Sequence, residues 1–339
     1  MTFFDMRSWW LVVLLNFSVA LSATCSQRVH GQETKEIGGK STAKEGDSKH
    51  AQKAENKLSK EYSNLTQSQV EADAEEGNVH AQVELGNRAK HAGDDVTALR
   101  WYRKAAEQNS FVAQYNLGLM LAKGEGAEKD GRKAVGWFEK AAEQGFASAQ
   151  LQLGVAYLNG LGVKKDHPQA VSWFDKAAQQ NNAEAQFSLG VIYSNGVGGV
   201  AKDDEKAAQW YQKSANQNHS GAQHNLGQMY SKGVGVAKDD QKAAMLYEES
   251  AEQNYAMAQS KLGDMYLTGR GVEKNMEKAL HWWRKAAEQN YVSAQFNLGI
   301  AYLTGGGVEK DESKAAEWLG KAAAQGHPRA RQMLGQPSK

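Results

Sequence analysis

A Leu-Gly step that recurs eight times at a nearly constant interval constrains this chain more than any other feature. Its glycines are Gly86, Gly118, Gly154, Gly190, Gly227, Gly263, Gly299 and Gly335. Successive glycines lie 32, 36, 36, 37, 36, 36 and 36 residues apart. A fixed period of this length predicts a helical solenoid, in which one helical unit is stacked many times.

Each unit contains two amphipathic helical patterns joined by a glycine loop, as residues 148–180 show. Small and apolar residues recur there at helical spacing, at Ala149, Leu153, Ala156 and Tyr157 and again at Ala170, Trp173, Phe174, Ala177 and Ala178. Neither helix can bury its apolar stripe alone, so each pair needs neighbours. We therefore predict an all-α, right-handed superhelical solenoid of stacked antiparallel helix pairs. The presence of only three prolines among 339 residues is consistent with so much helix.

Two columns of residues predict where the helices begin and end. A residue able to cap a helix N-terminus precedes each second helix, at Asp94, Asp130, Asp166, Asp203, Asp239, Asn275 and Asp311. A glycine or asparagine precedes each first helix, at Gly77, Asn109, Gly145, Asn181, Asn218, Asn254, Asn290 and Gly326. These two residue types tolerate the left-handed conformation that ends a helix and reverses the chain.

Two further columns predict how the helices pack. The glycine of the Leu-Gly step lies inside a first helix, where it costs about 1 kcal/mol relative to alanine, which predicts close approach of the paired helix. A tryptophan column, predicted to fill the space between units, consists of Trp101, Trp137, Trp173, Trp210, Trp282 and Trp318. Leu246 interrupts that column, so we expect a weaker junction in its unit.

The first residues predict export. Arg7 precedes an apolar run from Trp9 to Ala23 that ends in small residues, which is typical of a secretory signal peptide over residues 1–23. The run is shorter than the roughly 20 residues that span a bilayer, so we expect no membrane span in the mature chain. A lipid anchor at Cys25, the sole cysteine, is the alternative, although Ser22 stands where a lipoprotein signal normally has leucine. The expected location is periplasmic or secreted, most simply in a bacterium.

The rest of the chain divides by composition. Residues 24–66 are polar and predict a flexible tether, because they carry too few apolar groups for a core. Residues 67–77 predict a helix that caps the stack, beginning near Ser68 with a capping box to Glu71. Residues 78–335 hold seven full units and a final single helix, and residues 336–339 form a tail.

The recurring motifs resemble the Sel-one-like repeat family, a branch of the tetratricopeptide-like helical repeats. The resemblance rests on Ala113-Gln-Tyr-Asn-Leu-Gly118, Gly233-Val-Gly-Val236, Lys238-Asp239 and Trp101-Tyr-Arg-Lys-Ala-Ala-Glu-Gln108, and it covers residues 78–335. The family is known for scaffold and adaptor proteins, many of them exported by bacteria. A cysteine-rich branch pairs two cysteines within each repeat, and this chain lacks those pairs.

Several functional classes are disfavoured. A net charge of +1 gives no electrostatic reason to expect a nucleic-acid partner. The Gly-x-Gly loops lack a following Lys-Ser/Thr and follow no strand, so we interpret them as turns and not as phosphate sites. His219 and His224 are the nearest approach to a ligand pair, but five-residue spacing does not place them on one helical face. We expect no catalytic residue, metal site or cofactor.

A variable polar position on the first helices is the predicted binding site for an extended peptide. Its members, each just before a Leu-Gly step, are Asn116, Gln152, Ser188, Asn225, Lys261 and Asn297. First helices line the concave face in related repeats. The leading hypothesis is an exported, non-catalytic scaffold or adaptor that binds a protein or peptide. Two alternatives stay open: a secreted enzyme acting on cell-wall material, and a regulator within a eukaryotic secretory compartment, where Asn64 and Asn218 would be glycosylation acceptors.

Overall fold

The computed structural model describes residues 61–335, and all of the regular secondary structure in that range is helical. The predicted signal peptide, Cys25 and most of the predicted tether lie outside the described residues. The helices are α3 (Gln67–Glu75), α4 (Val79–His91), α5 (Asp95–Glu107), α6 (Phe111–Lys123), α7 (Gly131–Glu143), α8 (Ala147–Asn159), α9 (His167–Gln179), α10 (Ala183–Asn195), α11 (Asp204–Ala215), α12 (Ser220–Lys232), α13 (Asp240–Glu252), α14 (Ala256–Thr268), α15 (Met276–Glu288), α16 (Val292–Thr304), α17 (Glu312–Ala324) and α18 (Pro328–Met333), with one 3-10 turn, η1 (Val197–Gly199).

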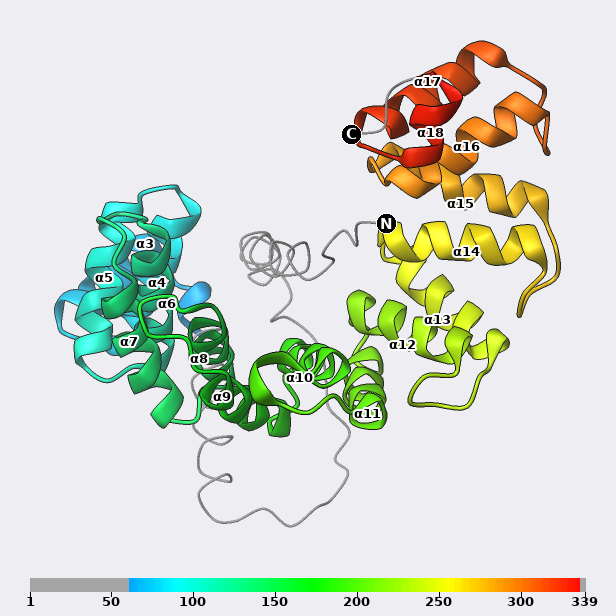
Figure 1. Ribbon diagram of the computed structural model, residues 1–339. Helices are drawn as coiled ribbons and strands as arrows, with labels where there is room; N and C mark the ends of the chain where they lie inside the picture. Colours follow the sequence, from blue (N-terminus) through cyan, green and yellow to red (C-terminus); the bar gives the residue numbers. More distant parts are fainter. Residues whose placement is uncertain (1–60, 336–339) are drawn as a thin grey trace. The chain divides into compact units, whose positions relative to one another are not determined.

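Consecutive helices pack against each other along the whole series (Figure 1). A unit consists of a first helix and the second helix that follows it, from α4 with α5 to α16 with α17. Each later first helix also packs on the second helix of the preceding unit, as α6 does on α5. The helix α3 covers the outer side of α4, and α18 packs on α17. The predicted all-α solenoid of stacked helix pairs is confirmed.

The helix ends lie where the two columns predict them. All seven acidic or asparagine residues of the first column cap a second helix, as Asp130 does by accepting a hydrogen bond from the Lys133 N–H at 3.0 Å. That bond holds the pKa of the Asp130 carboxyl below its usual value. All eight members of the glycine and asparagine column have φ between +62° and +94°. Both sets of boundaries are confirmed.

The start of α3 differs from the prediction. Its N-cap is Thr66, and the capping box joins Thr66 to Gln69, with the Thr66 N–H donating to Gln69 Oε1 at 2.9 Å. Ser68 lies inside the first turn, so the predicted box from Ser68 to Glu71 is wrong. Thr66 has the extended backbone that an N-cap requires, and Ser68 is already helical.

Each Leu-Gly glycine inside a first helix receives a large side chain from the second helix of its own unit. A Cβ atom added to Gly154 would lie 2.5 Å from the ring of Phe174, which is fully buried. The equivalent contacts join Gly86 to Tyr102, Gly118 to Phe138, Gly190 to Tyr211, Gly227 to Tyr247, Gly263 to Trp283 and Gly299 to Leu319. The predicted close approach is therefore real, and a side chain makes it.

The tryptophan column packs against the core, but most of its side chains are only half-buried. The fully buried ring is the next residue, as Phe174 is next to the half-buried Trp173. Trp173 does reach the core of the preceding units, but a lysine covers it: Lys176 Nζ lies 3.8 Å from the centre of the indole ring. Trp101 alone in the column is buried. The column contributes to the junctions as a half-exposed layer of cation–π pairs.

A row of glutamines, which the sequence analysis did not single out, ties the units together. Gln114 on α6 donates to the Ala106 carbonyl of the preceding unit at 3.3 Å and accepts from Gln144, after α7, at 2.8 Å. The same glutamine pair joins Gln82 to Gln108, Gln150 to Gln180, Gln186 to Gln217, Gln223 to Gln253, Gln259 to Gln289 and Gln295 to Gln325. Buried amides of this kind are costly unless both ends are bonded.

Arg331 occupies the glutamine position in α18. Its Nε donates to the Ala323 carbonyl at 3.0 Å, which replaces the carbonyl bond of a glutamine. No second helix follows α18 in the described range to donate a hydrogen bond to this position. Arginine suits the place because it has no acceptor atom that such a donor would have to satisfy.

The Gly-x-Gly loops make contacts between units. The second glycine of each loop lies against the start of the preceding unit's second helix, as Gly162 lies against the backbone of Gly131. A side chain there would collide with that helix. The loops therefore act as turns that also space the units.

Two glycine-to-alanine changes should have opposite effects. Gly136→Ala lies in mid-helix α7 with nothing within 4 Å of the added methyl group, and it should stabilise the protein by about 0.5–1 kcal/mol. Gly154→Ala drives a methyl group into Phe174 and should destabilise by about 1–3 kcal/mol. Denaturant midpoints compare them directly. Equal stabilisation by both changes would mean that the ring does not constrain the helix pair.

Candidate functional site

The six residues predicted to bind a peptide lie at equivalent places on six first helices, α6, α8, α10, α12, α14 and α16. Ser188 and Asn225 are buried there, and the other four side chains are half-buried. The row therefore offers one partly accessible polar group in most units.

The hydrogen bonds of the row differ from unit to unit. Ser188 Oγ donates to the Glu184 carbonyl of its own helix at 2.9 Å. Asn297 Nδ2 donates to Asp264 Oδ1 at 3.0 Å, and Lys261 Nζ lies 3.8 Å from the other carboxylate oxygen.

Three members of the row remain. Asn225 is buried, and its amide favours the ionised form of the Tyr211 phenol, opposing the effect of burial on the Tyr211 pKa. Asn116 and Gln152 have no side-chain hydrogen bond to any described residue, so these two amides are the ones whose donors and acceptors are open to a ligand.

Asp264 connects three helices on the face that carries the row. Besides Asn297 from α16, it accepts a hydrogen bond from Nε1 of the buried Trp283 on α15 at 3.1 Å. Burial raises the pKa of the Asp264 carboxyl, although Lys261 and the two donors favour its charged form. Asn87, at the equivalent place in the first unit, accepts from the Tyr102 hydroxyl at 2.8 Å. In these two units the residue after the Leu-Gly step thus satisfies the polar end of the buried ring, whereas the Tyr211 hydroxyl pairs with Ser194 at 3.3 Å.

The two neighbouring histidines do not form a ligand pair. His219 is the N-cap of α12, where Nδ1 accepts from the Ala222 N–H at 3.1 Å and Nε2 lies 3.0 Å from Glu184. His224 is 5% exposed and packs against the rings of Tyr247 and Tyr255 at 5.5 and 5.4 Å. Its Nδ1 has no hydrogen-bond partner in the described part of the chain. Burial, together with Lys261 and Lys232, lowers the pKa of His224 to about 4.

The stability of the protein should therefore fall on acidification in a way that depends on His224. The imidazole of His224 takes up a proton near pH 6.5 in the unfolded chain, but only near pH 4 in the folded protein. Protonation therefore favours the unfolded chain, and the free energy of unfolding decreases as the pH falls from 6.5 toward 4. The loss from this group is about 2 kcal/mol at pH 5. His224→Phe should abolish that component in denaturant unfolding measured at pH 7 and pH 5.

Phenylalanine is the matched replacement, because Phe187 and Phe296 occupy the equivalent places in α10 and α16. The capping carboxylates are common to both proteins and cancel in the comparison. The same loss of stability between pH 7 and pH 5 in both proteins would contradict the assignment to His224.

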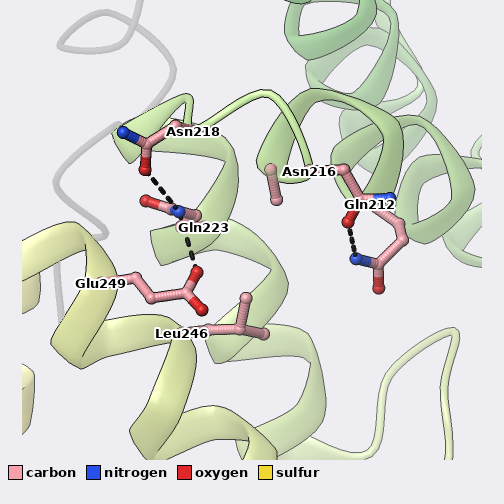
Figure 2. A pocket seen from close by; sticks show the side chains of 7 residues that line it. Gln212, Asn216, Asn218, Gln223, Leu246 and Glu249 are labelled. Atoms are coloured by element: carbon pink, nitrogen blue, oxygen red, sulfur yellow. Dashed lines mark hydrogen bonds between the residues drawn. The ribbon is translucent and has the colours of Figure 1, made fainter. Parts of the chain in front are cut away.

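One unit departs from the others on the second-helix side. Leu246 of α13 replaces the column tryptophan, and Glu249 replaces the lysine that covers it. In the other six units Lys104, Lys140, Lys176, Lys213, Lys285 and Lys321 lie 3.8–4.9 Å from the centres of their indole rings. A pocket of about 320 Å³ is found here, lined by Gln212, Ala215, Asn216, Asn218, Gln223, Leu246 and Glu249 (Figure 2).

Glu249 also changes the glutamine row at this unit. Gln223 Nε2 donates to Glu249 Oε2 at 2.9 Å, where its counterparts donate to a carbonyl of the preceding unit. Its second bond, to Asn218 Oδ1 at 3.2 Å (Figure 2), has equivalents in other units, such as that of Gln186 to Asn181. Gln223 Oε1 still accepts from Gln253 at 2.6 Å. On the α11 side of the pocket, Gln212 Nε2 donates to Asn216 Oδ1 at 2.8 Å. The lining therefore combines one carboxylate, four side-chain amides and one leucine.

The described residues contain neither a metal-binding cluster nor a membrane-spanning helix. Within residues 61–335 no three His, Cys, Asp or Glu side chains are grouped so that they could hold a metal ion. None of the helices in that range is both long enough and apolar enough to cross a membrane.

Comparison with known proteins identifies the repeated unit. The model of the Sel1 repeat family matches seven consecutive segments, 79–110, 112–146, 147–182, 183–219, 220–255, 256–291 and 292–327. No curated protein sequence matches the chain.

Two solved structures are similar over most of the chain. A protective antigen of uropathogenic Escherichia coli with an SLR fold is 38% identical, with a TM-score of 0.75 over 80% of this chain and 59% of the antigen. A Sel1 repeat protein of Oxalobacter formigenes is 37% identical, with a TM-score of 0.67 over 72% of this chain and 99% of that protein. The match thus spans about three fifths of the antigen's length.

Proposed function

Because this chain belongs to the Sel1 repeat family, whose members are generally protein-interaction scaffolds, we propose that it is an exported, non-catalytic scaffold that binds a protein or peptide on its first helices. The partner is held by contacts spread over several units. No chemical step is assigned to the chain.

One contrast between the columns supports this proposal. The residues that hold the units together, namely the leucine and glycine of the Leu-Gly step and the paired glutamines, are the same from unit to unit. The position just before the leucine instead changes among amide, hydroxyl and ammonium groups. Stacking does not dictate its chemistry, so it is available for recognition. Asn116 and Gln152, half-buried and unbonded, are the members that a peptide can use most directly.

The proposed peptide contacts can be tested on a partner isolated by cross-linking to the full chain. Each amide bond to the peptide contributes about 0.5–1.5 kcal/mol, so the double variant Asn116→Ala/Gln152→Ala should weaken binding about 10-fold, measured by titration calorimetry. Gln179→Ala on the exposed face of α9 makes the same chemical change as Gln152→Ala and should leave affinity unchanged. A folded double variant with the original affinity would remove the row from the binding site.

Export rests on the apolar run after Arg7 and its small-residue ending. The mature protein recovered from its host should begin just after Ser22 or Ala23, as determined by intact mass and N-terminal sequencing. A mature chain beginning at a lipid-modified Cys25 would establish the anchored form, and Cys25→Ser should then release the protein from membranes. Protein that retains Met1 would show that the segment is not cleaved.

A further inference from the structure

The unit formed by α12 and α13 inverts the charge of a position that is lysine in every other unit. Six lysines stand three residues after the column tryptophan, and Glu249 stands in their place on α13. No Lys, Arg or His among the described residues forms an ion pair with Glu249, whose Oε2 accepts only from the Gln223 amide. The carboxylate therefore lies at the pocket without a cation of its own.

The same unit also lacks the side chain that would fill the space. An indole has many more atoms than the leucine at position 246, and the pocket lies beside that leucine. A volume of about 320 Å³ is at the lower end of the range for ligand pockets, roughly 300–1,000 Å³. It suits a single long side chain better than a large cofactor.

The lining matches a side chain with an apolar stem and a planar cationic end. Leu246 offers an apolar surface for methylene groups, and Glu249 offers a carboxylate (Figure 2). The side-chain amides of Asn216 and Asn218 also line the pocket, and their oxygens already accept hydrogen bonds from Gln212 and from Gln223 and Gln253, so Glu249 is the acceptor that a new donor would find. A guanidinium group presents five donors in one plane and can bond both oxygens of a carboxylate together, which a lysine ammonium does less well.

The surroundings of the pocket favour a partner protein as the source of this side chain. Met245, beside Leu246, is 62% exposed and offers an apolar surface for the residues that flank an inserted arginine. Glu248, also exposed on α13, adds a second negative charge. From α11 and its C-terminal end, the pocket is lined by Gln212, Ala215 and Asn216, and none of these three is positively charged.

We propose that the pocket between α11, α12 and α13 receives an arginine side chain of the protein partner, with its guanidinium on Glu249 and its methylene groups on Leu246. The proposal deepens the scaffold function above and rests on it. It places one anchor of the partner at α11, α12 and α13, separate from Asn116 on α6 and Gln152 on α8.

The site can be tested without the partner, on the full-length protein, by NMR titration with N-acetylarginine amide. The side-chain amide signals of Asn216, Asn218 and Gln223 should shift in a saturable way. N-acetylcitrulline amide, which keeps the shape but lacks the charge, should bind at least 5-fold more weakly, and N-acetyllysine amide should also bind more weakly. Equal affinity of the arginine and citrulline compounds, or of the arginine and lysine compounds, would overturn the assignment.

Two variants complete the test. Glu249→Gln removes the charge with little change of shape and should weaken arginine binding at least 5-fold. Leu246→Trp/Glu249→Lys restores the pair present in the other six units, so it should fold normally by circular dichroism and lose binding entirely. Arginine binding retained in the folded double variant would overturn the proposal.

The outcome also separates this inference from the scaffold function. If the partner binds Leu246→Trp/Glu249→Lys as tightly as the unmodified protein, the arginine site is wrong and the scaffold function stands. If the arginine compound binds as expected but Asn116→Ala/Gln152→Ala leaves partner affinity unchanged, the pocket stands and the first-helix row is wrong.

Discussion

The contact between a glycine on each first helix and a large side chain on its paired second helix underlies the whole array. Because Gly154 has no side chain, Phe174 can rest on the helix backbone and bring the two axes close together. Larger residues at the glycine would force the pair apart and break the packing of every buried alanine around it. The loops vary in length, as the intervals of 32 and 37 residues show, but this contact recurs in each of the seven pairs.

Features that depend on one residue's own backbone could be predicted from the sequence. An asparagine with φ of +69° at position 109 and an aspartate that caps α7 at Asp130 each express a local preference. Which aromatic residue is buried could not be predicted in this way. Trp173 and Phe174 are adjacent, and successive residues on a helix differ by about 100° in direction, so the exact tilt of the pair decides between them.

The placement of the candidate residues at equivalent points of successive first helices was predictable, but their hydrogen bonds were not. Asn297 lies in the expected row, yet its partner Asp264 is 33 residues away on another first helix, and nothing local signals that bond. The pocket had a stronger signal. Leu246 visibly interrupts the tryptophan column, and the lysine three residues later is missing as well. The sequence does not show that the two changes are related. The structure does, because in the other units the lysine covers the indole.

Arg331 limits where a further unit can be added to the array. At every earlier junction a glutamine presents an oxygen that the next second helix satisfies, so a complete unit spliced between two others would inherit a matched donor and acceptor. A second helix placed behind α18 would complete an eighth unit and bring its glutamine N–H toward the Arg331 guanidinium, so two donors would face each other with no acceptor between them. A complete unit inserted between two existing units therefore keeps this bonding, whereas a second helix packed directly on Arg331 does not.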